Sequence, residues 1–268
     1  LWPVIFVAIG ISMMARRKKS LNAVVWLLTL AIFTGYGVYK GNEPGINSES
    51  NSIFDTNKYK FSLETFEPFE KEVAVPEGTE KGKIILNLGA VKLNLSDGSR
   101  DLFVKVNSNI PDLKQRFSEG KQSIMEYSRE RHDNVNTIRD FNLQMNPGLL
   151  WEIEGNIGAA DGRLDLTSVP TEKVSLTIGA GDLEVVVGKQ DIDTEISVRA
   201  GAADLDVYIP RDAGLRVKSE KFLTDINFHN ISMEKNHNEY ISENFKDADQ
   251  IIELNIYTAI SAINIFSN

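Results

Sequence analysis

The sequence contains no cysteine among its 268 residues, which excludes disulfides, thiolate catalysis and cysteine-ligated metal sites. It has three histidines, and none stands at a metal-binding spacing such as His-x-x-x-His. We therefore expect His132, His229 and His237 to be solvated surface residues. A Gly-x-Ser-x-Gly nucleophile motif, a phosphate-binding loop and a dinucleotide-binding fingerprint are also absent from the sequence. These absences predict a protein that is not an enzyme and has no catalytic residues, cofactor or metal.

Acidic residues are missing from the start of the chain. None occurs before Glu43, although five basic residues do. The remainder of the chain carries 24 basic residues (29 − 5) against 38 acidic ones, which is a net charge of −14. Because nucleic-acid binding relies on positive charge, this acidic remainder predicts no nucleic-acid partner.

Two uncharged stretches, residues 1–15 and 21–39, flank the basic cluster at residues 16–19. As a helix, the second stretch spans roughly 28 Å, close to the bilayer's hydrocarbon thickness of about 30 Å. We therefore expect a transmembrane helical hairpin over residues 1–39, with the lipid bilayer as a partner. Basic residues between spans stay in the cytoplasm, so the chain is expected in the cell membrane as a multi-pass protein with an extracytoplasmic C-terminal domain. A cleaved signal peptide is the alternative.

The rest of the chain divides into a tether and a domain. Residues 40–58 are rich in glycine, asparagine, serine and acidic residues, a composition that predicts a flexible tether. Residues 59–268 are expected to form the extracytoplasmic domain.

A short phrase is repeated along this domain. In its clearest copy, residues 176–187, apolar residues alternate with others on both sides of Gly179-Ala180-Gly181. Such alternation is typical of a strand with one buried face, and glycine permits a tight bend. Six copies can be aligned on their predicted bends, which are Gly89, Gly158, Gly179, Gly201, Glu220 and Tyr257.

The bends are 69, 21, 22, 19 and 37 residues apart. A step near 20 residues is the length of one unit in a stacked repeat protein. We therefore predict an all-β soluble domain of stacked, β-solenoid or β-helix-like repeats, preceded by two transmembrane helices, with Val185, Val207 and Ile226 in its interior. An antiparallel sandwich with similar hairpins is the alternative. The last copy is too apolar for an open end, so it should pair with residues 229–250 or with another chain, giving a homo-oligomer through the C-terminal coil.

One row of carboxylates is a candidate site. Asp161, Asp182 and Asp204 each follow their bend by three residues, so stacking would place them about 4.8 Å apart. The row could bind Ca²⁺ at the edge of the stack, or it could be a solvated row of turn residues. The second interpretation is preferred, and no metal ligand is assigned.

The repeated Gly-Ala step and the opening Leu1-Trp2-Pro3-Val4-Ile5 resemble the LiaF-type bacterial membrane proteins, whose soluble part is a toast-rack domain. The Pro-Arg-Asp step within residues 207–217 also matches this family. The four Gly-Ala steps are Gly89-Ala90, Gly158-Ala159, Gly179-Ala180 and Gly201-Ala202.

The resemblance implies a membrane-anchored, non-enzymatic regulator of the bacterial cell-envelope stress response. Such a protein would act by protein–protein interaction with a membrane sensor kinase. The alternative rests on the acidic surface and is an extracytoplasmic sensor that binds an envelope component or a cationic peptide. A β-solenoid carbohydrate enzyme is disfavoured, because the aspartate row is too regular and too close to the turns.

Overall fold

The computed structural model describes residues 68–129 and 139–268. The predicted membrane hairpin, the tether and His132 lie outside these residues. Within them, no helix is long and apolar enough to cross a bilayer. The described residues form thirteen strands and no helix, which confirms the all-β prediction for the domain.

The strands follow one another closely along the chain. They are β1 (Phe69–Ala74), β2 (Lys81–Asp97), β3 (Leu102–Ser108), β4 (Leu113–Ser118), β5 (Gln122–Arg129), β6 (Arg139–Met145), β7 (Leu150–Leu166), β8 (Thr171–Val187), β9 (Thr194–Ile209), β10 (Gly214–His229), β11 (Met233–Asn236), β12 (Glu239–Ser242) and β13 (Ile251–Ser267).

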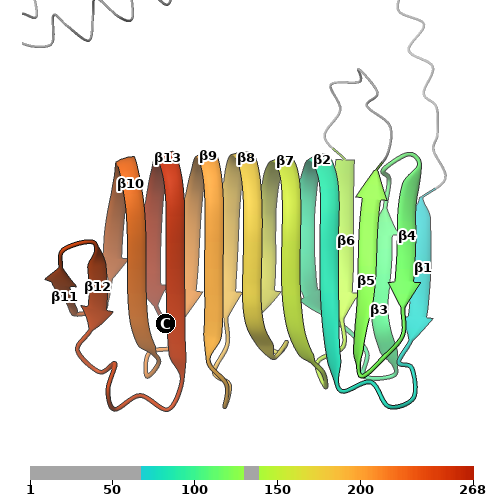
Figure 1. Ribbon diagram of the computed structural model, residues 1–268, viewed down its shortest axis with the longest axis horizontal. Helices are drawn as coiled ribbons and strands as arrows, with labels where there is room; N and C mark the ends of the chain where they lie inside the picture. Colours follow the sequence, from blue (N-terminus) through green and yellow to red (C-terminus); the bar gives the residue numbers. More distant parts are fainter. Residues whose placement is uncertain (1–67, 130–138) are drawn as a thin grey trace, which may run out of the picture. The chain divides into compact units, whose positions relative to one another are not determined.

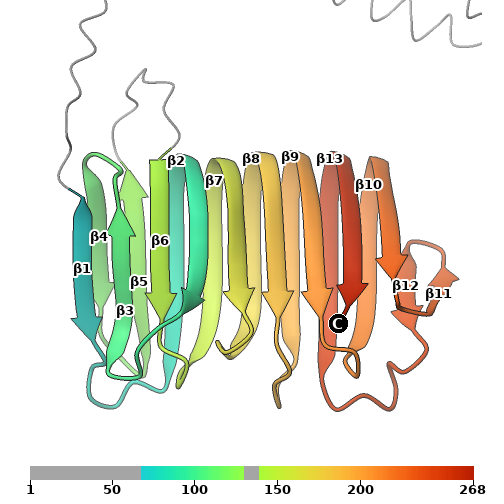
Figure 2. The same ribbon diagram turned by 180° about the vertical axis from the view of Figure 1, so that it is seen from behind.

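Six long strands of 16 or 17 residues form the body of the domain. They lie side by side in the order β2-β7-β8-β9-β13-β10 (Figures 1 and 2). Every neighbouring pair in this series is parallel. The prediction of stacked repeats is therefore confirmed, and the antiparallel sandwich is wrong.

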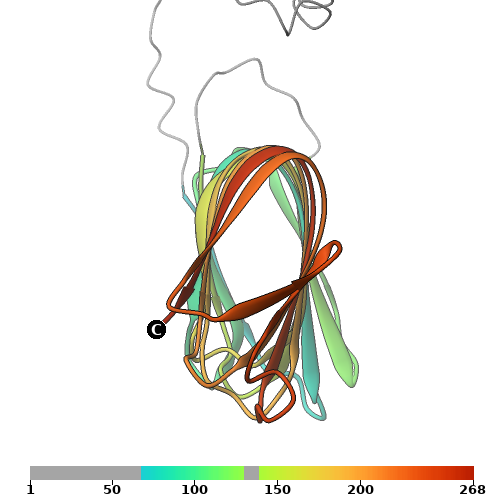
Figure 3. The same ribbon diagram turned by 90° about the vertical axis from the view of Figure 1, so that its left-hand side faces the viewer.

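Each long strand bends over to form an arch with two legs, as the end view in Figure 3 shows. In β8 the residues buried before the bend include Leu176 and Ile178, and those after it include Leu183 and Val185. A straight strand would bury residues at even separations only. The odd step from Ile178 to Leu183 therefore means that the bend turns the strand over, and both legs line one interior.

Glycine is required where neighbouring arches approach closely. Gly181 has a φ of +143°, and a Cβ added there would lie 1.7 Å from the carbonyl oxygen of Ala160. A Cβ at Gly179 would lie 2.3 Å from the carbonyl oxygen of Gly158. No side chain fits at these two distances, so packing between arches requires glycine at 179 and 181. At Gly158 an added Cβ would make only ordinary contacts, 3.5 Å from the nearest atom of Gly89.

The interior holds the predicted apolar positions. Val185 and Val207 are fully buried, and Ile226 is partly buried against the same core. This packing confirms the shared interior of the stack.

The last repeat lies inside the stack. This corrects the prediction that it forms the end of the stack and pairs with residues 229–250 or with another chain. Strand β13 pairs with β9 on one side and β10 on the other, and β12 pairs with β10 instead of β13. The physical reason is burial, because Ile252, Ile256 and Ile263 have no exposed surface. Both edges of this strand are occupied within the chain.

The bends of the last two copies also differ from the prediction. Pairs on both sides of Gly201 place Ala259 opposite it, and the same ladder places Phe222 opposite Ala259. The bends therefore fall two residues after Glu220 and Tyr257. Side chains alternate between the two faces of a strand with a period of two. A shift of two residues therefore still aligns apolar residues with apolar residues, and the sequence pattern cannot detect it.

The two ends of the stack are closed differently. At one end, β5 pairs with the first leg of β2 and β6 with its second leg. At the other end, the hairpin of β11 and β12 crosses the mouth of the arch (Figure 3). There the Tyr240 ring packs against Phe228, with ring centroids 5.2 Å apart. The hairpin thus shields the interior that β10 would otherwise leave open.

Candidate functional site

The outer face of the second legs carries the aspartate row that the sequence singled out. Asp161 is paired in register with Asp182, and Asp182 with Asp204. All three are exposed. Neighbouring strands of a sheet lie about 4.8 Å apart, so the predicted row of adjacent carboxylates is confirmed.

One member of this row accepts a hydrogen bond, and another, Asp161, lies in register with Lys92 of β2. Asp204 accepts a hydrogen bond from the backbone N–H of Ala262 at 3.1 Å. Asp161 and Asp182 make no hydrogen bond or ion pair with any other residue of the described ranges. Neighbouring like charges repel one another, so two adjacent free carboxylates form a site that favours a cation.

A second row lies two residues further along each strand, and sequence reasoning missed it. Arg163 pairs with both Glu184 and Asp165, and its Nη2 lies 3.1 Å from the Asp165 carboxylate. Asp206 accepts a hydrogen bond from the Asn264 side chain at 2.8 Å. The alternation of inward and outward residues along a strand would also have identified this row. Each member lies two residues after an aspartate of the first row.

The ion pairs of this row shift two pKa values. Hydrogen bonding to Asp165 raises the pKa of Arg163. Partial burial acts to raise the pKa of Asp165, but hydrogen bonds from Thr167 and Arg163 outweigh it and hold that pKa below its usual range. Both groups are therefore firmly charged at neutral pH, and the one cation of the row is already engaged.

Two shallow depressions share Gly162 in their lining. One has a volume of about 480 Å³ and is bordered by Lys92, Asp140 and Arg163. The other, of about 380 Å³, is bordered by five carboxylates that we call the acidic strip: Asp161, Asp182, Glu184, Asp204 and Asp206. No group of three or more His, Cys, Asp or Glu side chains in residues 68–129 and 139–268 is arranged to hold a metal ion.

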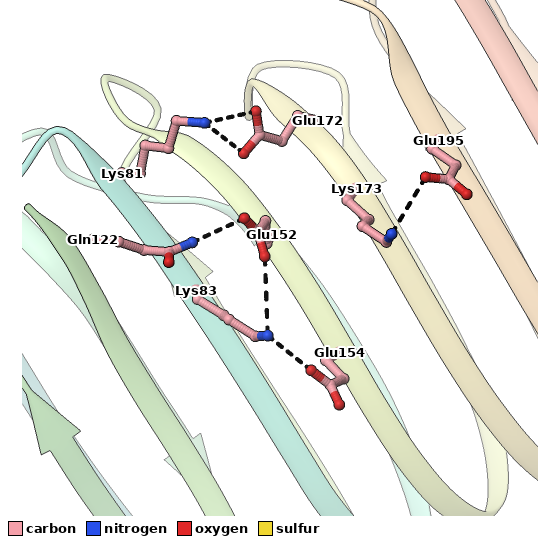
Figure 4. Close-up of polar contacts among 8 residues, drawn as sticks. All are labelled: Lys81, Lys83, Gln122, Glu152, Glu154, Glu172, Lys173 and Glu195. Atoms are coloured by element: carbon pink, nitrogen blue, oxygen red, sulfur yellow. Dashed lines mark hydrogen bonds and ion pairs between the residues drawn. The ribbon is translucent and has the colours of Figure 1, made fainter.

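The outer face of the first legs behaves differently, as Figure 4 shows. Charges alternate across the strands there, with Lys173 3.4 Å from Glu195 and Lys83 2.9 Å from Glu154. Lys81 pairs with Glu172 at 2.7 Å. The same in-register stacking is thus neutralised on one face and left acidic on the other, which marks the acidic strip as the candidate site.

The two histidines in the described residues are exposed, as predicted. The His229 ring stacks on Phe266 with centroids 4.5 Å apart, and Phe266 stacks on Tyr208 at 4.7 Å. His237 forms a hydrogen bond with Asn236 at 2.8 Å. Neither histidine lies at the acidic strip.

Comparison with known proteins gives one family and one close fold. Residues 52–208 match the family described as the N-terminal domain of toast_rack, DUF2154. No curated protein matches the chain. A candidate cell adhesion protein from Clostridium sporogenes superposes with a TM-score of 0.66 at 23% identity, covering 75% of this chain and 100% of the other. This likeness concerns the fold alone.

A more distant structure was also found. It is a candidate adhesin from Bacteroides fragilis with a TM-score of 0.30 and 8% identity, covering 74% of this chain and 97% of the other.

Proposed function

The chain belongs to the toast-rack family, and from this premise we propose that it is a membrane-anchored, non-enzymatic regulator of the cell-envelope stress response. In this proposal, residues 1–39 fix the protein in the cell membrane as a two-span hairpin and the repeat domain lies outside the cytoplasm. Its partner is a membrane sensor kinase, which it restrains.

The order of the parts carries this proposal. Two uncharged stretches flank a basic cluster, and a polar stretch follows them and leads into the toast-rack match, which begins at residue 52. Spans that hold a basic loop in the cytoplasm place the following domain on the opposite side. A rigid parallel stack with two charged outer faces is suited to present a binding surface there.

Capture of the sensor from membranes tests the regulator proposal. The full chain is compared with a variant whose residues 1–39 are replaced by an unrelated two-span hairpin of the same orientation. We expect a sensor kinase to co-purify with the native chain and to be lost from the variant. Loss of the chain should also raise the activity of a stress-response promoter. Equal capture by both chains, or an unchanged promoter, would contradict the proposal.

The acidic strip favours a second candidate function, recognition of a cationic peptide. Asp182 has no partner among the described residues, so the depression that it borders can accept positive charge without breaking an existing ion pair. Attraction between exposed charges is screened by salt, with a Debye length of about 8 Å at physiological ionic strength. Binding through the strip should therefore weaken as salt is raised.

Titration of the full chain with a lysine-rich peptide tests this second function. The variants are Asp161→Asn with Asp182→Asn and, as a control with the same change in charge, Glu154→Gln with Glu172→Gln on the first-leg face. We expect the paired neutralisation to reduce affinity at least fivefold and to flatten the salt dependence, and the control to change neither. An equal effect of both variants would indicate attraction by net charge alone, with no role for the strip.

A further inference from the structure

Within residues 68–129 and 139–268, no strand pairs with the outer edge of β10 along its second leg. Strand β10 pairs with β13 along its whole length. On its other side it pairs with β12 over Arg216–Lys218 alone within the described residues. The second leg, Asp225–His229, therefore has a partner on one side only. Of the residue types that protect natural edges from pairing, it carries one acidic residue, Asp225, and no proline or lysine.

Two outward-facing ladders of side chains run across the sheet to this edge and stop there. In one, the Asn264 amide donates to Asp206, and the Asn227 amide donates to the Asn264 side-chain oxygen at 3.1 Å. In the other, His229 stacks on Phe266, which stacks on Tyr208. A further strand at this edge would continue both ladders.

The hairpin that closes the end of the stack protects the interior of the arch. Tyr240 covers Phe228 from the open end, and Met233 packs against the core. The side chains of Asp225, Asn227 and His229 remain exposed on the outer face. The hairpin thus covers the inward, apolar side of this edge and leaves its outward, polar side chains exposed.

The residues of this edge are complementary to themselves when read in opposite directions. The sequence Asp225-Ile226-Asn227-Phe228-His229 has an acid at one end, a base at the other and an amide at the centre. In an antiparallel pair centred on Asn227, each aspartate faces a histidine, each isoleucine faces a phenylalanine, and the two asparagines face each other. An isologous contact between identical surfaces has this property.

We propose that the second leg of β10 pairs antiparallel with the same segment of a second copy of this chain, about a two-fold axis at Asn227. The contact joins two stacks into one continuous sheet. The acid–base complementarity of Asp225 and His229 selects a second copy over an unrelated extended peptide. The proposal does not depend on the regulatory role proposed above, because it concerns a different surface.

Cysteine cross-linking tests the geometry directly, since the native chain has no cysteine. Asn227→Cys would place two cysteines opposite each other across the axis, at a Cα separation of about 4.5–5.5 Å, within disulfide range. Asn264→Cys is the matched control, because its strand lies one spacing further from the axis. Its symmetric partner would be about 15 Å away, beyond the limit of about 7 Å.

With the full chain in its membranes, we expect mild oxidation to convert more than half of the Asn227→Cys protein to disulfide-linked dimer and less than a tenth of the Asn264→Cys protein. Equal yields from the two variants would overturn the proposal. So would a cross-link to a protein of another mass.

A charge-reversal cycle provides a second test that a folding defect cannot mimic. His229→Asp alone places two aspartates opposite each other at each end of the contact, and Asp225→Arg alone removes the acid that faces His229. Each, combined with Asn227→Cys, should lower the cross-linking yield at least threefold. The double change Asp225→Arg with His229→Asp restores opposite charges and should recover the yield. Failure of the double variant to exceed both single variants would contradict the two-fold register.

Discussion

At the scale of single residues, glycine sets how closely the arches can stack. The backbone at Gly181 adopts a positive φ, and the carbonyl oxygen of Ala160 occupies the space that a side chain would need. By contrast, Gly89 lies in the first arch, where an added Cβ would meet no atom within 4 Å. Glycine therefore has a strict steric role at Gly181 and a permissive one at Gly89.

Replacing these two glycines by alanine separates the two roles. Gly181→Ala should lower the free energy of unfolding by about 2 kcal/mol or more, because it combines backbone strain with a clash. Gly89→Ala should change it by less than about 0.5 kcal/mol. Urea denaturation followed by far-ultraviolet circular dichroism measures both values. Equal losses from the two variants would show that the bend needs glycine for flexibility alone.

Tyr127 is a second residue with a definite energetic consequence. Its ring is fully buried beside Phe141, at a centroid distance of 5.2 Å, and its hydroxyl makes no hydrogen bond within the described residues. Burial raises the pKa of this hydroxyl. The buried group thus holds its proton more tightly in the folded chain than in the unfolded one.

Tyr127→Phe removes this unpartnered hydroxyl and keeps the ring. We expect stability at pH 7 to be unchanged or raised by up to about 1 kcal/mol, because an unpaired buried polar atom is lost. With a folded pKa above the unfolded value of about 10, the tyrosine's contribution is lost as pH rises past that value. The free energy of unfolding, measured by denaturation at several pH values from 8 to 11.5, should therefore decrease less steeply with pH for Tyr127→Phe than for the native chain.

At the scale of elements, parallel register turns each outward residue into one member of a row. Lys173 lies between Glu152 and Glu195 in the row on the first legs. Its side chain is 50% exposed, so its ion pair with Glu195 is weak and screened by solvent. What the alternation prevents is a column of like charges at strand spacing.

Lys173→Glu creates a column of four adjacent glutamates, because Glu195 is itself in register with Glu253. We expect it to destabilise the domain by about 1 kcal/mol at low salt, with much of the loss recovered at 0.5 M salt. Lys173→Gln is the control and should cost less than half as much. Chemical denaturation at both salt concentrations decides this, and a loss that does not depend on salt would refute the electrostatic account.

The sequence was informative where a residue's role repeats from arch to arch. The aspartate row and the buried positions Val185 and Val207 follow from the period of the motif. The order of the last two arches does not, because pairing in a sheet is independent of chain order. A clue was present, since residues 218–225 form the most charged copy, as suits an edge strand, and residues 251–265 form the most apolar, as suits a central one.

At the scale of the whole domain, one continuous hydrophobic core runs through the arches and through the cap, by which we mean the strands β1 and β3–β6 at the β2 end of the stack. Trp151 is fully buried at the start of β7, and its indole N–H donates to the carbonyl oxygen of Asn146 at 2.8 Å. Its ring lies 4.9 Å from that of Phe103 in the cap. The place of the cap beside β2 follows from such non-repeating contacts, which no periodic pattern reveals.

The central claim is a stack of parallel arches in which the last repeat is inserted between β9 and β10. Ser197 lies in register with Asn255 of β13, and Asn255 with Lys218 of β10. In a chain without native cysteine, Ser197→Cys with Asn255→Cys would place two cysteines one strand spacing apart, about 4.8 Å. Ser197→Cys with Lys218→Cys would place them two spacings apart, about 9.6 Å.

Oxidation of these two double variants, followed by mapping of intramolecular disulfides, tests the claim most directly. The account predicts a disulfide between positions 197 and 255 and none between 197 and 218, because disulfides need Cα atoms within about 7 Å. The reverse result, a disulfide between 197 and 218 alone, would mean that the arches stack in chain order and would contradict the account.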